Sequence, residues 1–518
     1  MRYSLKRLAA ASLFAFTLNF YAPASYAMPP ILPYSEVTAG MEGTAYTVLD
    51  TSGEIRTFPV EILGNMEGGK GAQRMIMART SGVFIEQIGG VLQGMSGSPV
   101  YVGDRLVGAL AAGLKDLSPY TFFITPIEDM TPLWSMPDTK NQTNIDTIDL
   151  VKELEARKKA EEKRRLRERE KVFAKMSREE REAEWRDMIA ALNGEKTEGT
   201  AVNADETAPS NDAAAHADSA AEDAAAQSAS AAEEKAYFFT RGFNGAGLRY
   251  LQDKLPMGGA SFLPLGGSGA AAQLHTRYDA TLAGGQPVGV ALVYGDFSIG
   301  ATGTVTAVDG KKVVAFGHSF MHKGNVNYFM TDADVIGTIA GQSNGVKIAN
   351  IGSVIGRVNQ DRETGIAGVL GTFPTSVPVQ IHVKDNALGT EETFGVQIAY
   401  DEDFLPILSG SVAYAAMSRV ADSLGSSTAR IRFAIRTNAY DGGLFERRNM
   451  YYSAADVGQV AVTELLQAVN LIVTNAEQES DIIDVNVDVE LNGERQTALL
   501  VSATPDKMTV KPGDTVTF

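Results

Sequence analysis

Short runs of alternating apolar and polar residues, separated by glycine, serine and aspartate, fill the chain between residues 28 and about 135. Such alternation predicts strands, because it places every second side chain on one face of a sheet, where a core can cover it. We therefore expect a β-rich unit over residues 28–135, with a short helix at 126–134 near its end. The expected strands are 44–49, 57–63, 75–78 and 120–125.

Two pairs of glycine and aspartate mark tight hairpins. Gly103-Asp104 separates two apolar runs in the first β-rich stretch, and Asp309-Gly310 separates two more further along the chain. Such dipeptides favour the two-residue turns whose twist matches that of paired strands. A second β-rich unit is therefore expected over residues 237–400. The paired runs are 99–102 with 105–111, and 303–308 with 311–316.

Helical spacing of apolar residues occurs in two other parts of the chain. Residues 458–471 carry apolar side chains three and four positions apart and 482–491 alternates as a strand, so 401–505 is expected to be an α+β region. Residues 150–194 are dense in lysine, arginine and glutamate, which predicts a charged helical insertion. It either packs on its neighbour as a helical hairpin or binds an envelope protein as a coiled coil.

Two segments are not expected to form a core of their own, the first because it has few large apolar residues and the second because its strand-like pattern is short. Residues 195–236 are an acidic stretch rich in alanine and serine, and we expect a disordered linker there because nothing offsets the entropy of ordering it. His216 lies inside this linker and is not expected to be functional. Residues 506–518 look like the start of an incomplete β-sandwich-like segment.

Residues 1–27 have the parts of a secretory signal peptide. Basic residues precede an apolar run over 8–20, and the small residues near its end suit cleavage after Ala27. The run is shorter than the roughly 20 residues that span a bilayer, which favours cleavage over an uncleaved membrane anchor. No later stretch is long and apolar enough to cross a membrane, so the mature chain is expected in the periplasm or outside the cell.

The composition excludes several classes of function. The chain contains no cysteine, which removes disulfides, thiolate metal sites and cysteine nucleophiles. Its net charge of −17 opposes sequence-independent binding of nucleic acid, which needs a basic face. We expect no metal and no organic cofactor.

The strongest candidate for chemistry is Ser96, which lies between glycines in the run Gly-Met-Ser-Gly-Ser-Pro at 94–99. A serine on such a tight turn can expose its hydroxyl, and small neighbours let a scissile carbonyl approach. The backbone N–H groups of Gly94 and Ser96 can converge into an oxyanion hole. Ser98 is expected to support the turn. The alternative is an ordinary glycine-rich turn.

A serine nucleophile needs a base, and His318 is the best placed of the five histidines. It follows the Asp309-Gly310 hairpin within Phe-Gly-His-Ser-Phe at 316–320, where a residue beside a glycine can project as a general base. His322 is the second choice. His275 and His382 lie in strand-like surroundings. A structural histidine is the alternative for His318.

These two stretches carry a resemblance. Residues 90–99 resemble the serine motif of the SpoIVB sporulation peptidase family, and 316–320 resemble its Gly-His motif, with further similarity at 354–356 and 364–368. The similarity covers roughly 40–135 and 285–400. The chain resembles in particular the larger exported bacterial proteins with this peptidase domain, in which the serine block comes first.

The chain departs from the SpoIVB peptidase itself in two ways. The order of the serine and histidine blocks is reversed, so the expected fold is a permuted-looking one in which spatial adjacency replaces chain order. The family's acidic residue, some fifteen positions before the nucleophile, corresponds here to Ser81. Asp361 is our substitute for the third member of a triad, with Asp332 and Asp334 as rivals.

The resemblance implies a mainly β, chymotrypsin-like double β-barrel built from two separated segments. It implies an exported serine endopeptidase that acts on protein or peptide substrates of the cell envelope. One alternative is an inactive, peptidase-like envelope scaffold that binds peptides, which the serine at position 81 and the helical insertion favour. Another is an adhesin or assembly factor that works through its C-terminal region.

Overall fold

A computed structural model describes most of the two β-rich units and the C-terminal region. The signal peptide, the helical insertion and the acidic linker expected from the sequence lie outside the described residues, as do His216 and His275. The described ranges are 28–67, 73–114, 118–140, 237–255, 260–265, 276–341, 345–421, 424–439, 442–478, 480–498 and 500–517.

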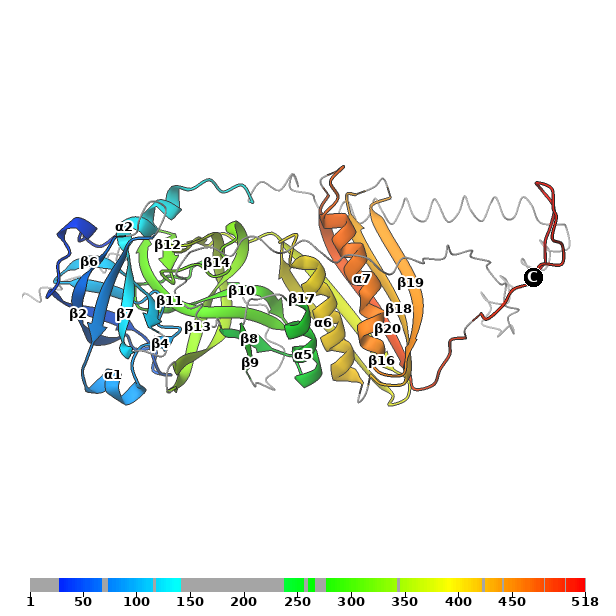
Figure 1. The fold of residues 1–518 in the computed structure, drawn as a ribbon, viewed down its shortest axis with the longest axis horizontal. Helices are drawn as coiled ribbons and strands as arrows, with labels where there is room; N and C mark the ends of the chain where they lie inside the picture. The colour runs from blue at the N-terminus through cyan, green and yellow to red at the C-terminus, as the bar shows by residue number, and fades with distance from the viewer. Residues whose placement is uncertain are drawn as a thin grey trace, which may run out of the picture. The chain divides into compact units, whose positions relative to one another are not determined.

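The first unit is a closed antiparallel barrel of six strands, in the order β1-β2-β3-β7-β6-β5. Its strands are drawn in blue and cyan in Figure 1. Every strand expected here from the alternating pattern is present, and the Gly103-Asp104 turn joins β5 to β6. The barrel closes over apolar side chains that are almost fully buried, among them Phe58, Ile76 and Phe122. The bounds are β1 (Glu42–Thr47), β2 (Arg56–Met66), β3 (Met75–Thr80), β5 (Pro99–Val102), β6 (Arg105–Leu114) and β7 (Ser118–Pro126).

Short helices surround this barrel. The helix expected at 126–134 is present as a turn of α-helix followed by a turn of 3-10 helix, whereas the helix between β3 and β4 had no clear sequence signal. Strand β4 is not part of the barrel and pairs in parallel with β14 of the second unit. The bounds are η1 (Tyr34–Glu36), α1 (Val83–Ile88), β4 (Leu92–Gln93), α2 (Ile127–Met130) and η2 (Thr131–Ser135).

Six strands of the second unit pair in a ring. The order around the ring is β10, β13, β14, β15, β12 and β11, and β11 pairs with β10 to close it. All six pairings are antiparallel. The Asp309-Gly310 turn joins β11 to β12, as its sequence predicts. The bounds are β10 (Pro287–Gly295), β11 (Ser298–Asp309), β12 (Lys312–Ala315), β13 (Gly324–Ile339), β14 (Gly345–Arg362) and β15 (Gly365–Leu370).

The same sheet continues beyond this ring in both directions. Strands β8 and β9 extend it next to β11, and β17, β16, β20, β18 and β19 extend it next to β10. Strand β16 pairs in parallel with β20, so hydrogen bonds join the region before residue 400 to the region after it. The bounds are β8 (Tyr237–Arg241), β9 (Ser261–Pro264), β16 (Ser376–Asp385), β17 (Thr390–Ala399), β18 (Ser427–Thr437), β19 (Leu444–Ser453) and β20 (Ile482–Asn492).

Two long helices, α6 and α7, cover one face of the β16–β20 part of the sheet, and α5 packs against α6 (Figure 1). Helix α7 matches the helical spacing seen at 458–471. Almost all residues of helix α6 are buried. A helix buried on all sides needs no polar face, so its sequence lacks the amphipathic spacing that would have predicted it. The bounds are α5 (Gly245–Lys254), α6 (Leu405–Val420) and α7 (Val457–Val473).

The described residues 506–517 contain no strand, which corrects the expectation of a β-sandwich-like segment there. The Asp506 N–H donates to the Thr517 carbonyl at 2.8 Å, but Met508 is 89% exposed and Val510 is 47% exposed. An alternating pattern becomes a strand only where a partner strand and a core cover it. Overall the fold is mainly β with one closed six-stranded barrel, as the sequence predicted at this level.

Around Gly97, the backbone of the first unit packs directly against the backbone of the six-stranded ring. A Cβ atom at this position would lie 1.8 Å from the Thr304 carbonyl oxygen and 2.6 Å from the Phe316 nitrogen. Its φ of +96° is also one that side-chain-bearing residues rarely adopt. Glycine is therefore required here both by conformation and by the space between the two units.

We expect Gly97→Ala to lower the free energy of unfolding by more than about 3 kcal/mol, because overpacking adds to the left-handed backbone strain. Gly103→Ala is the matched control: its φ is +62°, but nothing lies within 4 Å of its Cβ position. Strain alone should cost that variant about 1 kcal/mol. Denaturant unfolding measures both. Equal losses in the two variants would contradict the close contact at Gly97.

Candidate active site

The serine motif forms a tight turn between β4 and β5. The Met95 N–H donates to Leu92 O at 3.1 Å, and the Ser98 N–H donates to Met95 O at 2.9 Å. The Gly97 N–H donates across to Leu110 O of β6 at 2.7 Å. Gly94, like Gly97, has a positive φ (+88°). The glycines of the motif are thus the residues that let the chain turn so sharply.

The two serines of the turn have different surroundings. Ser98 is fully buried, and its hydroxyl donates to Met95 O at 2.6 Å, which confirms that it supports the turn. Ser96 is only 8% exposed, and its hydroxyl lies 3.4 Å from the carbonyl oxygen of Ala111. The sequence suggested a more exposed hydroxyl, but the residue is buried, and its carbonyl accepts from the Thr304 N–H of the second unit at 2.8 Å. Its single long hydrogen bond holds the hydroxyl weakly.

His318 lies three residues beyond the end of β12. The chain turns there through Phe316 and Gly317, whose φ values are +69° and +74°. The imidazole is partly exposed, and its Nδ1 lies 2.7 Å from the carbonyl oxygen of Ser319. A carbonyl only accepts hydrogen bonds, so in the neutral ring Nδ1 carries the proton and Nε2 keeps its lone pair. This is the tautomer that a general base acting through Nε2 requires.

The serine and histidine blocks meet at one interface. The hydroxyl of Thr125, at the end of β7, donates to the carbonyl of Gly317 at 2.5 Å, and a Cβ on Gly317 would lie 2.9 Å from Ala109 Cβ. On the other side of this contact, the Gly97 turn reaches Phe316. Among the described residues no hydrogen bond joins the Ser96 hydroxyl to the His318 imidazole. The blocks, far apart in sequence, are nevertheless neighbours in space.

Asp361 organises the loop that follows His318. Its carboxylate is fully buried on β14 and accepts hydrogen bonds from the backbone N–H groups of Phe320 (2.7 Å), Met321 (2.8 Å) and Lys323 (3.2 Å). Burial raises the pKa of this carboxyl, and the three N–H donors oppose that rise. Asp361 therefore fixes the backbone of the histidine loop rather than bonding to the imidazole ring.

The other acidic and histidine candidates lie elsewhere. Asp332 accepts from the Ser353 N–H and pairs with Arg277, and Asp334 is exposed on the same strand. Ser81, which occupies the place of the family's acid, is exposed just before α1. Of the other described histidines, His322 is exposed in the loop with φ +57°, and His382 pairs with Glu391 on the sheet. Neither has a hydrogen bond to the serine turn among the described residues.

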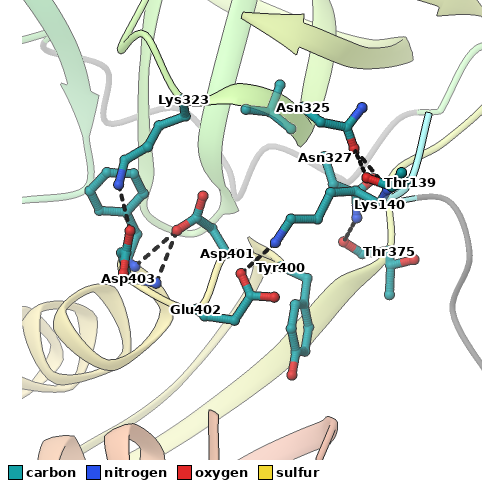
Figure 2. A network of polar contacts seen from close by, with 12 residues as sticks. Thr139, Lys140, Lys323, Asn325, Asn327, Thr375, Tyr400, Asp401, Glu402 and Asp403 are labelled. Carbon is teal, nitrogen blue, oxygen red and sulfur yellow. Dashed lines mark hydrogen bonds and ion pairs between the residues drawn. The ribbon is translucent and has the colours of Figure 1, made fainter. Parts of the chain in front are cut away.

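A short acidic segment after β17 ties this loop to the end of the first unit. Figure 2 shows Lys323 and Lys140 approaching the neighbouring carboxylates of Asp403 and Glu402. Asp401 accepts from the Asp403 N–H and, deeper in, from the Tyr328 hydroxyl at 3.1 Å. Burial raises the pKa of the Asp401 carboxyl. The histidine loop and the chain leaving the barrel are thus held by one segment.

The residues that lead out of the barrel, 137–140, lie along β13 and β14. The Arg357 guanidinium, 2% exposed, makes two hydrogen bonds to the Asp138 carboxylate at 2.6 and 2.7 Å. The Asn325 and Gln360 side chains both donate to Pro137 O at 2.9 Å. A bidentate, buried arginine pair is among the strongest polar contacts available. We call residues 137–140 the strap.

Sequence reasoning missed Lys347. This lysine of β14 is fully buried, and its Nζ donates to the Thr304 hydroxyl at 2.9 Å. Desolvation lowers its pKa to about 7. The only signal in the sequence is a lysine within an otherwise apolar run, Gly-Val-Lys-Ile-Ala at 345–349, which is also what an exposed strand position looks like.

The described residues offer little evidence of other chemistry. A cavity of about 480 Å³ lies over β10, β16, β17, β18 and β20 and includes no residue of the serine or histidine block. Within the described ranges, no three acidic or histidine side chains are grouped so as to hold a metal ion. None of the described helices has the length and hydrophobicity needed to cross a bilayer.

Comparison with known proteins supports the resemblance seen in the sequence. Residues 21–130 match the family model described as SpoIVB peptidase S55. This segment contains the whole serine turn and all six barrel strands. No curated protein and no solved structure matches the chain.

We expect Asp361→Asn to loosen the histidine loop, because an amide offers one acceptor oxygen where the carboxylate offers two and places an NH₂ group against backbone donors. The free energy of unfolding should fall by about 2 kcal/mol. Hydrogen exchange should quicken at the amides of Phe320, Met321 and Lys323. The exposed Asp334→Asn is the control and should change stability by no more than about 0.5 kcal/mol. Unchanged protection of these three amides would refute the role of Asp361.

Proposed function

We propose that the chain is an exported serine endopeptidase. The match of residues 21–130 to the SpoIVB peptidase family model supports a serine peptidase in general. The proposed substrates are proteins or peptides of the cell envelope. The proposal for export rests on the basic and apolar pattern of residues 1–27, with cleavage after Ala27.

One observation carries this proposal: the serine turn and the histidine segment, 222 positions apart at Ser96 and His318, pack against each other. A peptidase cleft needs such adjacency in space and no particular chain order. The ring of β10 to β15, beside the closed barrel, supports a chymotrypsin-like pair of barrels with permuted order. Ser96 comes from one unit and His318 from the other.

The mechanism follows from the groups present. Nε2 of His318 takes the proton from the Ser96 hydroxyl while Oγ attacks the peptide carbonyl, and the N–H groups of Gly94 and Ser96 stabilise the resulting oxyanion. The imidazolium then gives its proton to the leaving amine, and an acyl-enzyme forms. Water, activated by the same imidazole, attacks the ester and releases the acid and the free serine. Asp361 supports this cycle by fixing the loop that carries the base.

A second function is favoured by one observation. Ser96 is nearly covered, and its hydroxyl faces the Ala111 carbonyl, an arrangement that suits a peptidase-like scaffold without activity. Against this, nucleophile–base hydrogen bonds in many hydrolases shorten only when substrate binds. We also propose that the insertion at 150–194 is the site where an envelope partner binds.

Ser96→Ala should abolish both proteolysis and labelling by a fluorophosphonate, because only the nucleophile is removed. Stability should change by no more than about 0.5 kcal/mol, since the lost hydrogen bond is long. His318→Ala should reduce kcat to a similar extent, as residues acting as a unit lose their effect together.

Ser98→Ala is the control within the same turn and should keep its reactivity toward the fluorophosphonate while losing some stability. Labelling that survives Ser96→Ala but disappears with Ser98→Ala would mean that Ser98, and not Ser96, is the nucleophile. If the wild-type protein neither cleaves unfolded proteins nor reacts with the fluorophosphonate, the peptidase proposal is contradicted and the scaffold function is favoured.

A further inference from the structure

Lys347 is the most unusual charged residue in the described part of the chain. It is fully buried and makes no ion pair with any described carboxylate. Its pairing partner on β13 is Thr338, and its amine donates to the Thr304 hydroxyl of β11; neither residue carries a charge. Burial without a counter-charge disfavours the ammonium form and costs stability. A lysine with only a packing role would be better replaced by an apolar residue of similar size.

The lysine lies directly behind the serine turn. A Cβ on Gly94 would be 3.1 Å from Lys347 Cβ and 3.4 Å from its Cε, so the lysine stem packs against the backbone of this glycine. The Thr304 hydroxyl, which accepts from the Lys347 amine, donates in turn to the Gly94 carbonyl at 3.1 Å. The Thr304 N–H also donates to Ser96 O at 2.8 Å.

These contacts fix one peptide plane. The Gly94 carbonyl is held by Thr304, and the N–H of the same peptide, that of Met95, is held by Leu92 O. Consecutive hydrogen bonds polarise and strengthen one another in a dry interior. This peptide plane lies between Gly94 and Ser96, whose N–H groups are the proposed oxyanion donors. It is the peptide between the two that carry these donors, so holding it restricts the directions that both can take.

We propose that Lys347 is a positioning residue of the serine centre, which acts through the Thr304 hydroxyl to hold the Gly94–Met95 peptide in the orientation that an oxyanion hole requires. The proposal rests on the proposed peptidase function. It assigns the buried amine a role in the transition state rather than in folding or substrate binding. The amine is buried at a cost in desolvation, which is common for groups that serve catalysis.

The test compares Lys347→Met with the wild type in the full chain. Methionine has similar length and no charge, so the variant should unfold at a higher temperature than the wild type at pH 7. Its kcat should fall about 10- to 100-fold with KM changed less than about twofold, because the oxyanion donors act mainly in the transition state. Thr304→Val, which breaks the same relay one step later, should give the same split. Lys384→Met, an exposed lysine on β16, is the control and should leave kcat unchanged.

Stability measured against pH gives a readout that does not depend on activity. The pKa of Lys347 is about 7 in the folded chain, below the ordinary lysine value of 10.5. Between these values the unfolded chain binds the extra proton, so wild-type stability should rise as pH increases from about 7 to about 10. The difference between wild type and Lys347→Met should follow this rise and become constant below pH 7.

The outcomes separate the two proposals. A Lys347→Met variant that is less stable than the wild type, or that keeps full kcat while Ser96→Ala is inactive, would overturn the positioning role alone. Activity that survives Ser96→Ala would instead overturn the peptidase centre, whatever Lys347 does. A more stable but slower Lys347→Met variant, with Lys384→Met unaffected, supports the positioning role.

Discussion

The contact between two backbones at Gly97 is the constraint on which the candidate site depends. The Thr304 N–H donates to Ser96 O at 2.8 Å, and the Thr306 hydroxyl donates to Gly97 O at 2.8 Å, so the turn is bonded to β11 on both sides of the glycine. A side chain at this position would separate the two units. The glycine thus does more than permit a turn, because it lets β11, the strand that precedes the Asp309-Gly310 turn, approach the backbone of Ser96.

The polar side chains around the site fall into two groups: buried carboxylates that hold the loop backbone, and the two residues proposed to react. Asp361 and Asp401 are buried acids with raised pKa values, and both accept hydrogen bonds from backbone N–H groups of loops. Their burial costs free energy that the hydrogen bonds offset only where the loop adopts one conformation. Ser96 and His318 have few partners by comparison. The side chains that exchange protons in the proposed mechanism are thus held loosely, and the backbone around them is held firmly.

Much of the fold and half of the site could be predicted from the sequence, for physical reasons that differ by element. The hairpins around Gly103-Asp104 and Asp309-Gly310 were predictable because two-residue turns depend on local conformation. Helix α6 was not, because a helix buried on all sides has no amphipathic period. Lys347 was not, because its burial is decided by strands from three parts of the chain. Contact between the serine and histidine blocks followed from family resemblance and not from any local pattern.

The strap has a further consequence for the integrity of the chain. It is bound to the second unit by Arg357, and the chain is next described at Tyr237, where β8 pairs with β11 of the same unit. Both ends of the intervening segment are therefore tied down independently of what joins them. A cut between residues 141 and 236 would yield two polypeptides that remain associated through the Gly97 contact and the strap. Ser96 would then lie on one polypeptide and His318 on the other, so two separately expressed fragments should together restore the proposed peptidase.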